Sequence, residues 1–95
     1  MNDKSAPFTR KITIINKRGL HARASAKFCA VSESYDARII VSKDGIEVGG
    51  CSIMGLLTLG AGPGSEIEIK TEGRQAREAL DTLAKLVADR FGEKD

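Results

Sequence analysis

The chain has 95 residues, of which 41% are hydrophobic and 29% charged. This length fits one compact domain and is too short for a two-lobed enzyme with a deep cleft; the composition is that of a soluble globular protein rather than a disordered or membrane-spanning one. The net charge of +2 is unevenly distributed, because the stretch from Lys4 to Ser32 has many basic residues and no acidic one. A one-sided basic surface favours an anionic partner, such as a phosphate group, an acidic protein or a nucleic acid.

Two features of the sequence bear on the cellular compartment. Residues 1–7 contain no apolar stretch of the kind found in secretory signals, so we expect a cytoplasmic protein with no contact to a membrane. The two cysteines, Cys29 and Cys51, fall in different predicted elements, and a reducing compartment would keep both as thiols. A structural zinc site normally has four ligands, so one histidine and two scattered cysteines predict no metal site, and we expect no cofactor.

The first predicted elements are a strand and a helix. Residues 9–15 alternate apolar and polar side chains, which is typical of a half-buried strand. After Gly19 the period changes, and apolar residues three or four positions apart predict a helix that runs to about Ser34. These apolar residues are Leu20, Ala24, Phe28 and Val31. The start of this predicted helix is at His21.

A hairpin and a short helix come next. Two β-branched runs, residues 37–43 and 46–48, are separated by Asp44-Gly45, a dipeptide typical of tight hairpins because both residues tolerate positive φ. Residues 52–59 form a short helical run, and Ser52 is well placed to cap its N-terminus.

The remaining sequence predicts a loop, a strand and the longest helix. Residues 60–64 are rich in glycine, residues 66–70 alternate with Ile67 and Ile69 facing inward, and residues 74–91 have a helical apolar stripe. The stripe consists of Ala76, Leu80, Leu83, Val87 and Phe91. The order β-α-β-β-α-β-α predicts an α+β domain with helices on one face of a four-stranded, mostly antiparallel sheet. We expect the folded domain over residues 9–92 and flexible segments at residues 1–8 and 93–95.

His21 is the only histidine in the chain. A lone histidine is often no more than a surface or core residue, but this one opens a predicted helix between Arg18 and Arg23. Helix N-termini bind anions through their free N–H groups and the positive end of the dipole, and an arginine adds a charge-assisted contact to a phosphate. We therefore predict that His21 accepts a phosphoryl group as a nucleophile and that Arg23 contacts that group.

Two motifs resemble those of a known family. Gly19-Leu20-His21-Ala22-Arg23 is similar to the active-site motif of the HPr phosphocarriers of the bacterial phosphotransferase system, and residues 52–57 (SIMGLL) are similar to their second signature. The resemblance extends over about residues 11–91 and implies the open-faced sandwich fold of that family. It also implies a stoichiometric carrier rather than an enzyme, which receives phosphate on Nδ1 of His21 from Enzyme I and donates it to an EIIA-type protein.

One position departs from the family pattern. Ala24 stands where the family usually has a proline directly after the arginine. Proline is tolerated in the first turn of a helix because its missing N–H has no helical partner there. Alanine should therefore keep the helix and add one backbone donor near the phosphate, and the rate of transfer could differ.

Ser52 matches the position at which HPr kinase/phosphorylase modifies some members of the family. A phosphate there would lie at the N-terminus of the short helix and would add negative charge beside the docking surface. The alternative is a capping serine that is never modified, because such serines are common. We expect regulatory phosphorylation, although Cys51 stands where many relatives have lysine.

A carrier that meets several proteins needs an adaptable apolar surface with a charged rim. We predict this docking surface next to His21, with Met54 the most exposed of its apolar residues, and we expect the chain to act as a monomer. The predicted docking residues are Arg18, Lys27, Ile53, Met54 and Leu57.

Two other functions fit parts of the sequence. A nucleic-acid-binding module would use the basic segment, but the chain has few aromatic residues, and Phe28 belongs to the predicted core, which leaves no platform for stacking bases. A regulatory carrier of the nitrogen-related branch would be phosphorylated on the same histidine and would act mainly by binding a partner. The stretch from Ile14 to Arg23 resembles the nitrogen-related branch at least as well as the sugar-transport branch, so the sequence alone does not separate the two.

Overall fold

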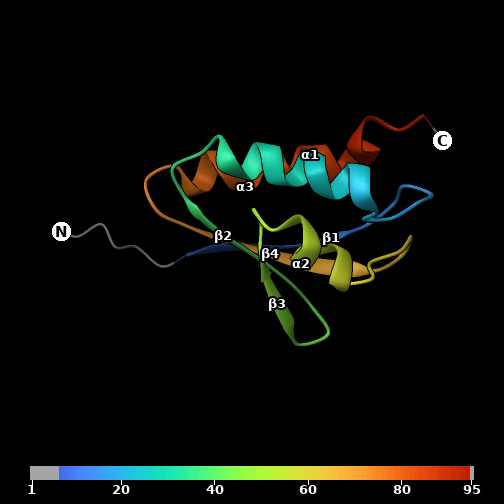
Figure 1. The fold of residues 1–95 in the computed structure, drawn as a ribbon. Coiled ribbons are helices and arrows are strands. Elements are labelled where there is room, and N and C mark those ends of the chain that lie inside the picture. The colour runs from blue at the N-terminus through green and yellow to red at the C-terminus, as the bar shows by residue number, and fades with distance from the viewer. Residues whose placement is uncertain (1–6, 95) are drawn as a thin grey trace.

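The computed structural model describes residues 7–94, and its elements follow the predicted order β-α-β-β-α-β-α (Figure 1). The elements are β1 (Phe8–Thr13), α1 (Ala22–Glu33), β2 (Arg38–Lys43), β3 (Ile46–Gly49), α2 (Ile53–Thr58), β4 (Glu66–Glu72), α3 (Ala76–Ala88) and the short 3₁₀ turn η1 (Arg90–Gly92). None of the helices within residues 7–94 is long and apolar enough to cross a membrane.

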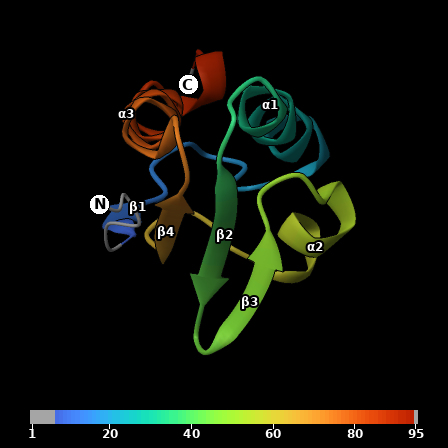
Figure 2. The same cartoon turned by 90° about the vertical axis from the view of Figure 1, so that its left-hand side faces the viewer.

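The four strands form one sheet in the order β1-β4-β2-β3, and each neighbouring pair is antiparallel. Side chains alternate across the sheet, so Ile67 and Ile69 of β4 are buried under the helices while Glu66 and Glu68 lie on the opposite face. Figure 2 shows α1 and α3 above one face of the sheet, α2 beside β3, and the other face uncovered. The predicted open-faced sandwich is confirmed.

The core lies between the sheet and the helices, and the helical periodicity of the sequence identified most of it. All five residues of the predicted α3 stripe are buried, and in the first helix only Val31 is partly rather than fully buried. The hairpin turn is also confirmed, because Asp44 and Gly45 have φ values of 52° and 84°. The local sequence patterns therefore predicted the helices and strands that support His21.

Several element boundaries differ from the expectation, among them the end of β1, which lies at Thr13 and not at residue 15, and the boundaries near the two ends of the chain. Phe8, assigned to a flexible N-terminal segment, is the first residue of β1 and pairs with Thr71 of β4, whereas residues 1–6 lie outside the described part of the chain. At the other end, α3 stops at Ala88, and Arg90 and Phe91 have φ values of 56° and 55°. The chain leaves the helix in a left-handed turn, yet the ring of Phe91 is only 1% exposed and still fills the core.

Candidate functional site

The turn before α1 determines where His21 lies. Gly19 has a φ of +65°, and a Cβ at this position would lie 2.4 Å from the carbonyl oxygen of Ala61. The backbone N–H of Leu20 donates to the same oxygen at 2.8 Å, and the Leu20 side chain is buried. Because the two loops are in direct contact, the backbone on the N-terminal side of His21 is fixed and only glycine fits at position 19.

His21 is the N-cap of α1, which confirms that it begins the helix. Its backbone is extended, and its Nδ1 accepts a hydrogen bond from the backbone N–H of Arg23 at 3.3 Å. The first turn of α1 contains no acidic residue, so nothing on the helix itself neutralises the positive end of the dipole. Nδ1 therefore points its lone pair toward the anion-binding end of the helix.

The other ring nitrogen of His21 contacts Glu93, a residue 72 positions away in the C-terminal segment that the sequence predicts to be flexible. Nε2 lies 2.5 Å from Glu93 Oε2, and Asn16 Nδ2 donates to Glu93 Oε1 at 3.0 Å. The hydrogen bonds from His21 and Asn16, together with the nearby Arg18 guanidinium, hold the pKa of the Glu93 carboxyl below its usual value. Glu93 is thus an ionised part of the site, and no local pattern in the sequence indicated it.

A left-handed turn carries the chain to this position. We call residues 90–94 the C-terminal strap; Figure 1 shows it at the same end of the helical layer as the start of α1. Arg90 and Phe91 each adopt a left-handed conformation that costs about 1–2 kcal/mol for a non-glycine residue. Burial of Phe91 and a 2.7 Å hydrogen bond from Lys27 Nζ to the Phe91 carbonyl offset this cost. Lys27, a predicted docking residue, therefore has a bonding partner within its own chain.

The groups around His21 line a hollow of about 240 Å³. It is lined by Arg18, His21, Arg23, Glu93 and Lys94. Its cationic side chains outnumber its single carboxylate, which suits an anionic group of the size of a phosphate. The structure thus brings Arg18 and Arg23 together at His21, as the sequence predicts.

Ser52 caps α2, as predicted. Its Oγ accepts the backbone N–H of Gly55 at 2.9 Å, and the residue is exposed. Cys51 is also exposed, and its carbonyl oxygen accepts a hydrogen bond from the buried Cys29 thiol of α1 at 3.1 Å. This contact ties the turn before Ser52 to the helix that begins at His21.

The short helix α2 presents an apolar surface. Met54 is 72% exposed and Ile53 39%, while Leu57 is partly exposed and Leu56 is fully buried. The expectation that Met54 is the most exposed of the three predicted docking residues of this helix is confirmed. The exposed methionine side chain can adopt several conformations, while the buried Leu56 packs α2 against the core.

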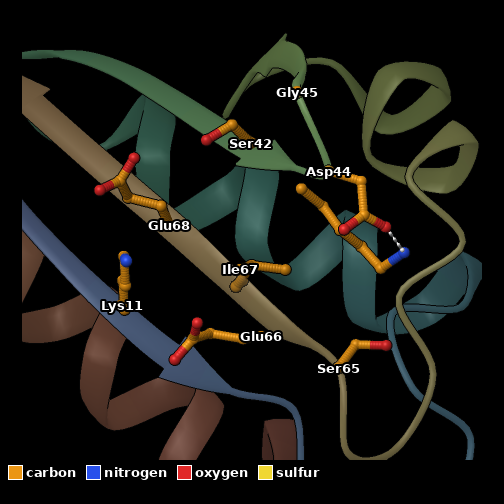
Figure 3. Close-up of a pocket in the computed structure, with 9 residues that line it drawn as sticks. Lys11, Ser42, Asp44, Gly45, Ser65, Glu66, Ile67 and Glu68 are labelled. Carbon is orange, nitrogen blue, oxygen red and sulfur yellow. Dashed lines mark hydrogen bonds and ion pairs between the residues drawn. The ribbon is translucent and has the colours of Figure 1, made fainter.

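A second hollow, of about 470 Å³, lies on the uncovered face of the sheet and shares no residue with the hollow at His21. Figure 3 shows Glu66, Glu68 and Lys11 around it, so its charges are mixed. Within residues 7–94 there is no group of three or more histidine, cysteine or acidic side chains that could hold a metal ion. The two hollows therefore differ in charge, since cationic side chains predominate at His21 and acidic and basic ones are mixed on the sheet.

Comparison with known sequences shows which proteins the chain resembles. A family model described as the PTS HPr component phosphorylation site matches residues 8–89. The phosphocarrier protein HPr of Cupriavidus necator is 46% identical over 84 residues, which cover 88% of this chain and 94% of that protein. The phosphocarrier protein NPr of Shewanella violacea is 38% identical, with 88% of this chain and 92% of that protein covered.

Solved structures show the same architecture. HPr from Thermoanaerobacter tengcongensis matches with a TM-score of 0.89 and 36% identity, covering 93% of this chain and 99% of that chain. HPr from Bacillus anthracis matches with a TM-score of 0.84 and 41% identity, covering 87% and 99%.

Proposed function

The chain belongs to the HPr family of phosphocarrier proteins of the phosphotransferase system, and we propose that Nδ1 of His21 receives a phosphoryl group from Enzyme I and passes it to an EIIA-type protein. The observation that supports this assignment is the position of Nδ1 at the N-terminus of α1, 3.3 Å from the Arg23 N–H. In this role the chain is a stoichiometric carrier and not a catalyst.

The proposed step is a displacement at phosphorus. The lone pair of Nδ1 forms the new N–P bond while the bond between phosphorus and the donor breaks, and the electron pair of that bond leaves with the donor. Free N–H groups at the start of α1 and the Arg23 guanidinium bind the phosphoryl oxygens. Transfer to the acceptor is the same reaction in reverse.

Ala24 contributes to this site through its backbone. The first helical hydrogen bond that ends on His21 comes from Ser25 N–H at 2.8 Å, so the N–H of Ala24 precedes the regular hydrogen-bonding pattern of the helix. A proline at position 24 would lack this donor. We expect Ala24→Pro to retain phosphorylation and to change its rate.

Incubation with phosphoenolpyruvate and Enzyme I, followed by intact-mass measurement, tests the proposal. We expect the wild type to gain one phosphate per chain that is lost on mild acid treatment, and His21→Ala to gain none. Arg23→Ala should still be labelled but more slowly, because it removes a phosphate contact and leaves the nucleophile. A wild type that stays unlabelled, or a His21→Ala chain that is labelled, would contradict the assignment.

We propose that Met54, Ile53 and Leu57 of α2, together with Arg18, form the surface that docks these partners. Met54→Gln should raise the KM for transfer from Enzyme I about tenfold, as expected for one of the few contacts that carry most of the binding energy of an interface, with an unchanged free energy of unfolding. Ile46 of β3 is 52% exposed and lies outside α2, so Ile46→Gln is a matched control that should transfer normally. Equal transfer by the two variants would rule out α2 as the docking surface.

We also propose that HPr kinase/phosphorylase modifies Ser52. Its exposure and its place at the N-terminus of α2 support this, because a phosphate there would still accept the Gly55 N–H and would bring negative charge to the docking surface. ATP and the kinase should give an acid-stable phosphate that is absent in Ser52→Ala and present in Ser65→Ala. Labelling that persists in Ser52→Ala would show that the modified residue is another one.

We propose an EIIA-type protein of either branch as the recipient, because relatives named HPr and NPr both match over most of the chain. A regulatory role in the nitrogen-related branch is the second candidate, and it is supported by the similarity to NPr. We propose that the chain is a cytoplasmic monomer, as expected from its sequence. A similar solved structure is named as an HPr dimer, from Thermoanaerobacter tengcongensis (TM-score 0.73, 39% identity), so sedimentation of the free protein is the matching measurement.

A further inference from the structure

Resting on the function proposed above, we propose that Glu93, held by Asn16, is a positioning residue that fixes the protonation pattern of the His21 ring and balances the charge that the ring gains when Nδ1 is phosphorylated. Glu93 contacts Nε2, the ring nitrogen that is not proposed to be phosphorylated. It acts on the phosphoryl group only through His21.

The protonation pattern follows from the chemistry of the two partners. An ionised carboxylate can only accept hydrogen bonds, so the nitrogen 2.5 Å from Glu93 Oε2 must be Nε2–H. In a neutral imidazole the other nitrogen, Nδ1, then carries no proton, and its lone pair can accept a hydrogen bond. The Arg23 N–H donates to Nδ1, and this contact requires the same tautomer. Both sides of the ring therefore favour the form in which Nδ1 is the nucleophile.

Asn16 determines where the carboxylate lies. Its side chain is completely buried, and Nδ2 donates both to Glu93 Oε1 at 3.0 Å and to the Gly19 carbonyl at 2.9 Å. The opposite amide orientation would place an oxygen against two acceptors, so only one orientation is compatible with the site. Asn16 thus links Glu93 to the same turn that positions His21.

The C-terminal strap holds Glu93 from the other side. Phe91 is buried in the core, and Lys27 donates to its carbonyl, two residues before Glu93. The carboxylate is therefore delivered by a packed segment that is anchored on α1, the helix that His21 caps.

This arrangement stabilises the phosphorylated ring. When the lone pair of Nδ1 forms a bond to phosphorus and Nε2 keeps its proton, the ring becomes positively charged. A carboxylate hydrogen-bonded to Nε2 offsets that charge, as the aspartate does for the histidine of a catalytic triad. The reverse step, in which the ring becomes neutral and the phosphoryl group departs, leaves the hydrogen bond in place.

A single-turnover transfer from phosphorylated Enzyme I, measured over a range of carrier concentrations, tests this role. We expect Glu93→Ala to lower the limiting rate about tenfold, the lower end of the effect of a hydrogen bond to a charged group in a partly exposed site, without raising the apparent KM. Glu93→Gln keeps a hydrogen-bond acceptor but loses the charge, so its limiting rate should lie between those of the wild type and Glu93→Ala. Glu47→Gln, an exposed residue of β3 with the same change in net charge, is the control and should match the wild type.

Nitrogen-15 NMR of the His21 ring separates positioning from a merely structural effect. In the wild type we expect the ring proton on Nε2, with a resonance protected from exchange with water. In Glu93→Ala this protection should be lost and the form with the proton on Nδ1 should become populated, because only the Arg23 N–H contact then opposes it. A slower transfer with an unchanged ring spectrum would contradict the positioning role, as would a Glu93→Ala chain equal to the wild type in both. If the wild type takes no phosphate on His21, the proposed function fails, and the ring spectrum alone still decides where Glu93 holds the proton.

Discussion

The chemistry of the site depends on the different partners of the two nitrogens of one imidazole. Nδ1 faces the N–H of Arg23 and the end of a helix, whereas Nε2 faces a carboxylate. A histidine without these contacts would be a nucleophile with no fixed orientation and no bound counter-charge. At the scale of single residues, the neighbours of His21 therefore make it suitable for phosphoryl transfer.

The ionisation of Glu93 has a consequence for stability at low pH. Hydrogen bonds from His21 and Asn16 lower its pKa in the folded chain, so its contribution to stability is present above the unfolded pKa, near 4.5, and is lost as the pH falls through the lower folded value. The other titratable groups that line its hollow are His21, Arg18, Arg23 and Lys94.

We therefore expect the free energy of unfolding of the wild type to fall more steeply below pH 5 than that of Glu93→Gln. Urea denaturation at a series of pH values measures both slopes. Glu47→Gln, at an exposed position of β3, serves as the control and should keep the wild-type slope. Parallel curves for the wild type and Glu93→Gln would show that the carboxylate makes no such contribution.

The residues that the sequence predicted are those whose role is local. His21, Arg23 and Ser52 each stand at the start of a helix, where a motif and a cap can be recognised within a few positions. Glu93 could not be predicted, because its contact with His21 depends on a left-handed turn at Arg90 and Phe91, and neither residue type favours positive φ. The part of the site that the sequence did not predict is therefore the part formed by contacts between residues far apart in the chain.

At the scale of elements, periodicity predicted the helices and strands, and tertiary packing set their ends. Strand β1 begins one residue earlier than expected because Phe8 finds a partner in β4, and α3 ends at Ala88 because the chain must bend for Phe91 to reach the core. The turn at Gly19 also sets where an element begins, since it joins β1 to α1 and contacts the loop at Ala61.

Gly19→Ala should destabilise the fold and reduce transfer to His21 together. The new Cβ would lie 2.4 Å from the Ala61 oxygen, and the residue would have to keep a φ of +65°, so we expect a loss of about 2 kcal/mol or more in the free energy of unfolding. Gly62→Ala is the control: its Cβ would meet nothing within 4 Å, and no positive φ is required. Chemical denaturation compares the two, and similar stabilities would mean that the turn tolerates a side chain.

At the scale of the whole molecule, the functional groups lie at one end of the helical layer. Arg18, Arg23 and Lys94 surround His21 there, whereas the uncovered sheet face mixes acidic and basic side chains. A cationic surface of this kind speeds encounter with an acidic partner, and salt screens the effect over a distance of about 10 Å at 0.1 M.

The rate of transfer from Enzyme I should therefore fall several-fold as the salt concentration rises from about 0.05 to 0.5 M. Arg18→Gln should weaken this dependence, while Arg38→Gln, an exposed residue of β2 outside the site, should leave it unchanged. Stopped-flow measurements at several salt concentrations give the slopes. If Arg38→Gln alone flattened the slope, the docking surface would be on the sheet and not around His21.

The most direct test of the central claim is to locate the phosphorus atom. After transfer from Enzyme I to a chain labelled with nitrogen-15, phosphorus–nitrogen coupling identifies the atom that is bound. We predict a single phosphate coupled to Nδ1 of His21, with the proton still on Nε2. Coupling to Nε2, or phosphate on any other residue with His21 unmodified, would contradict the account.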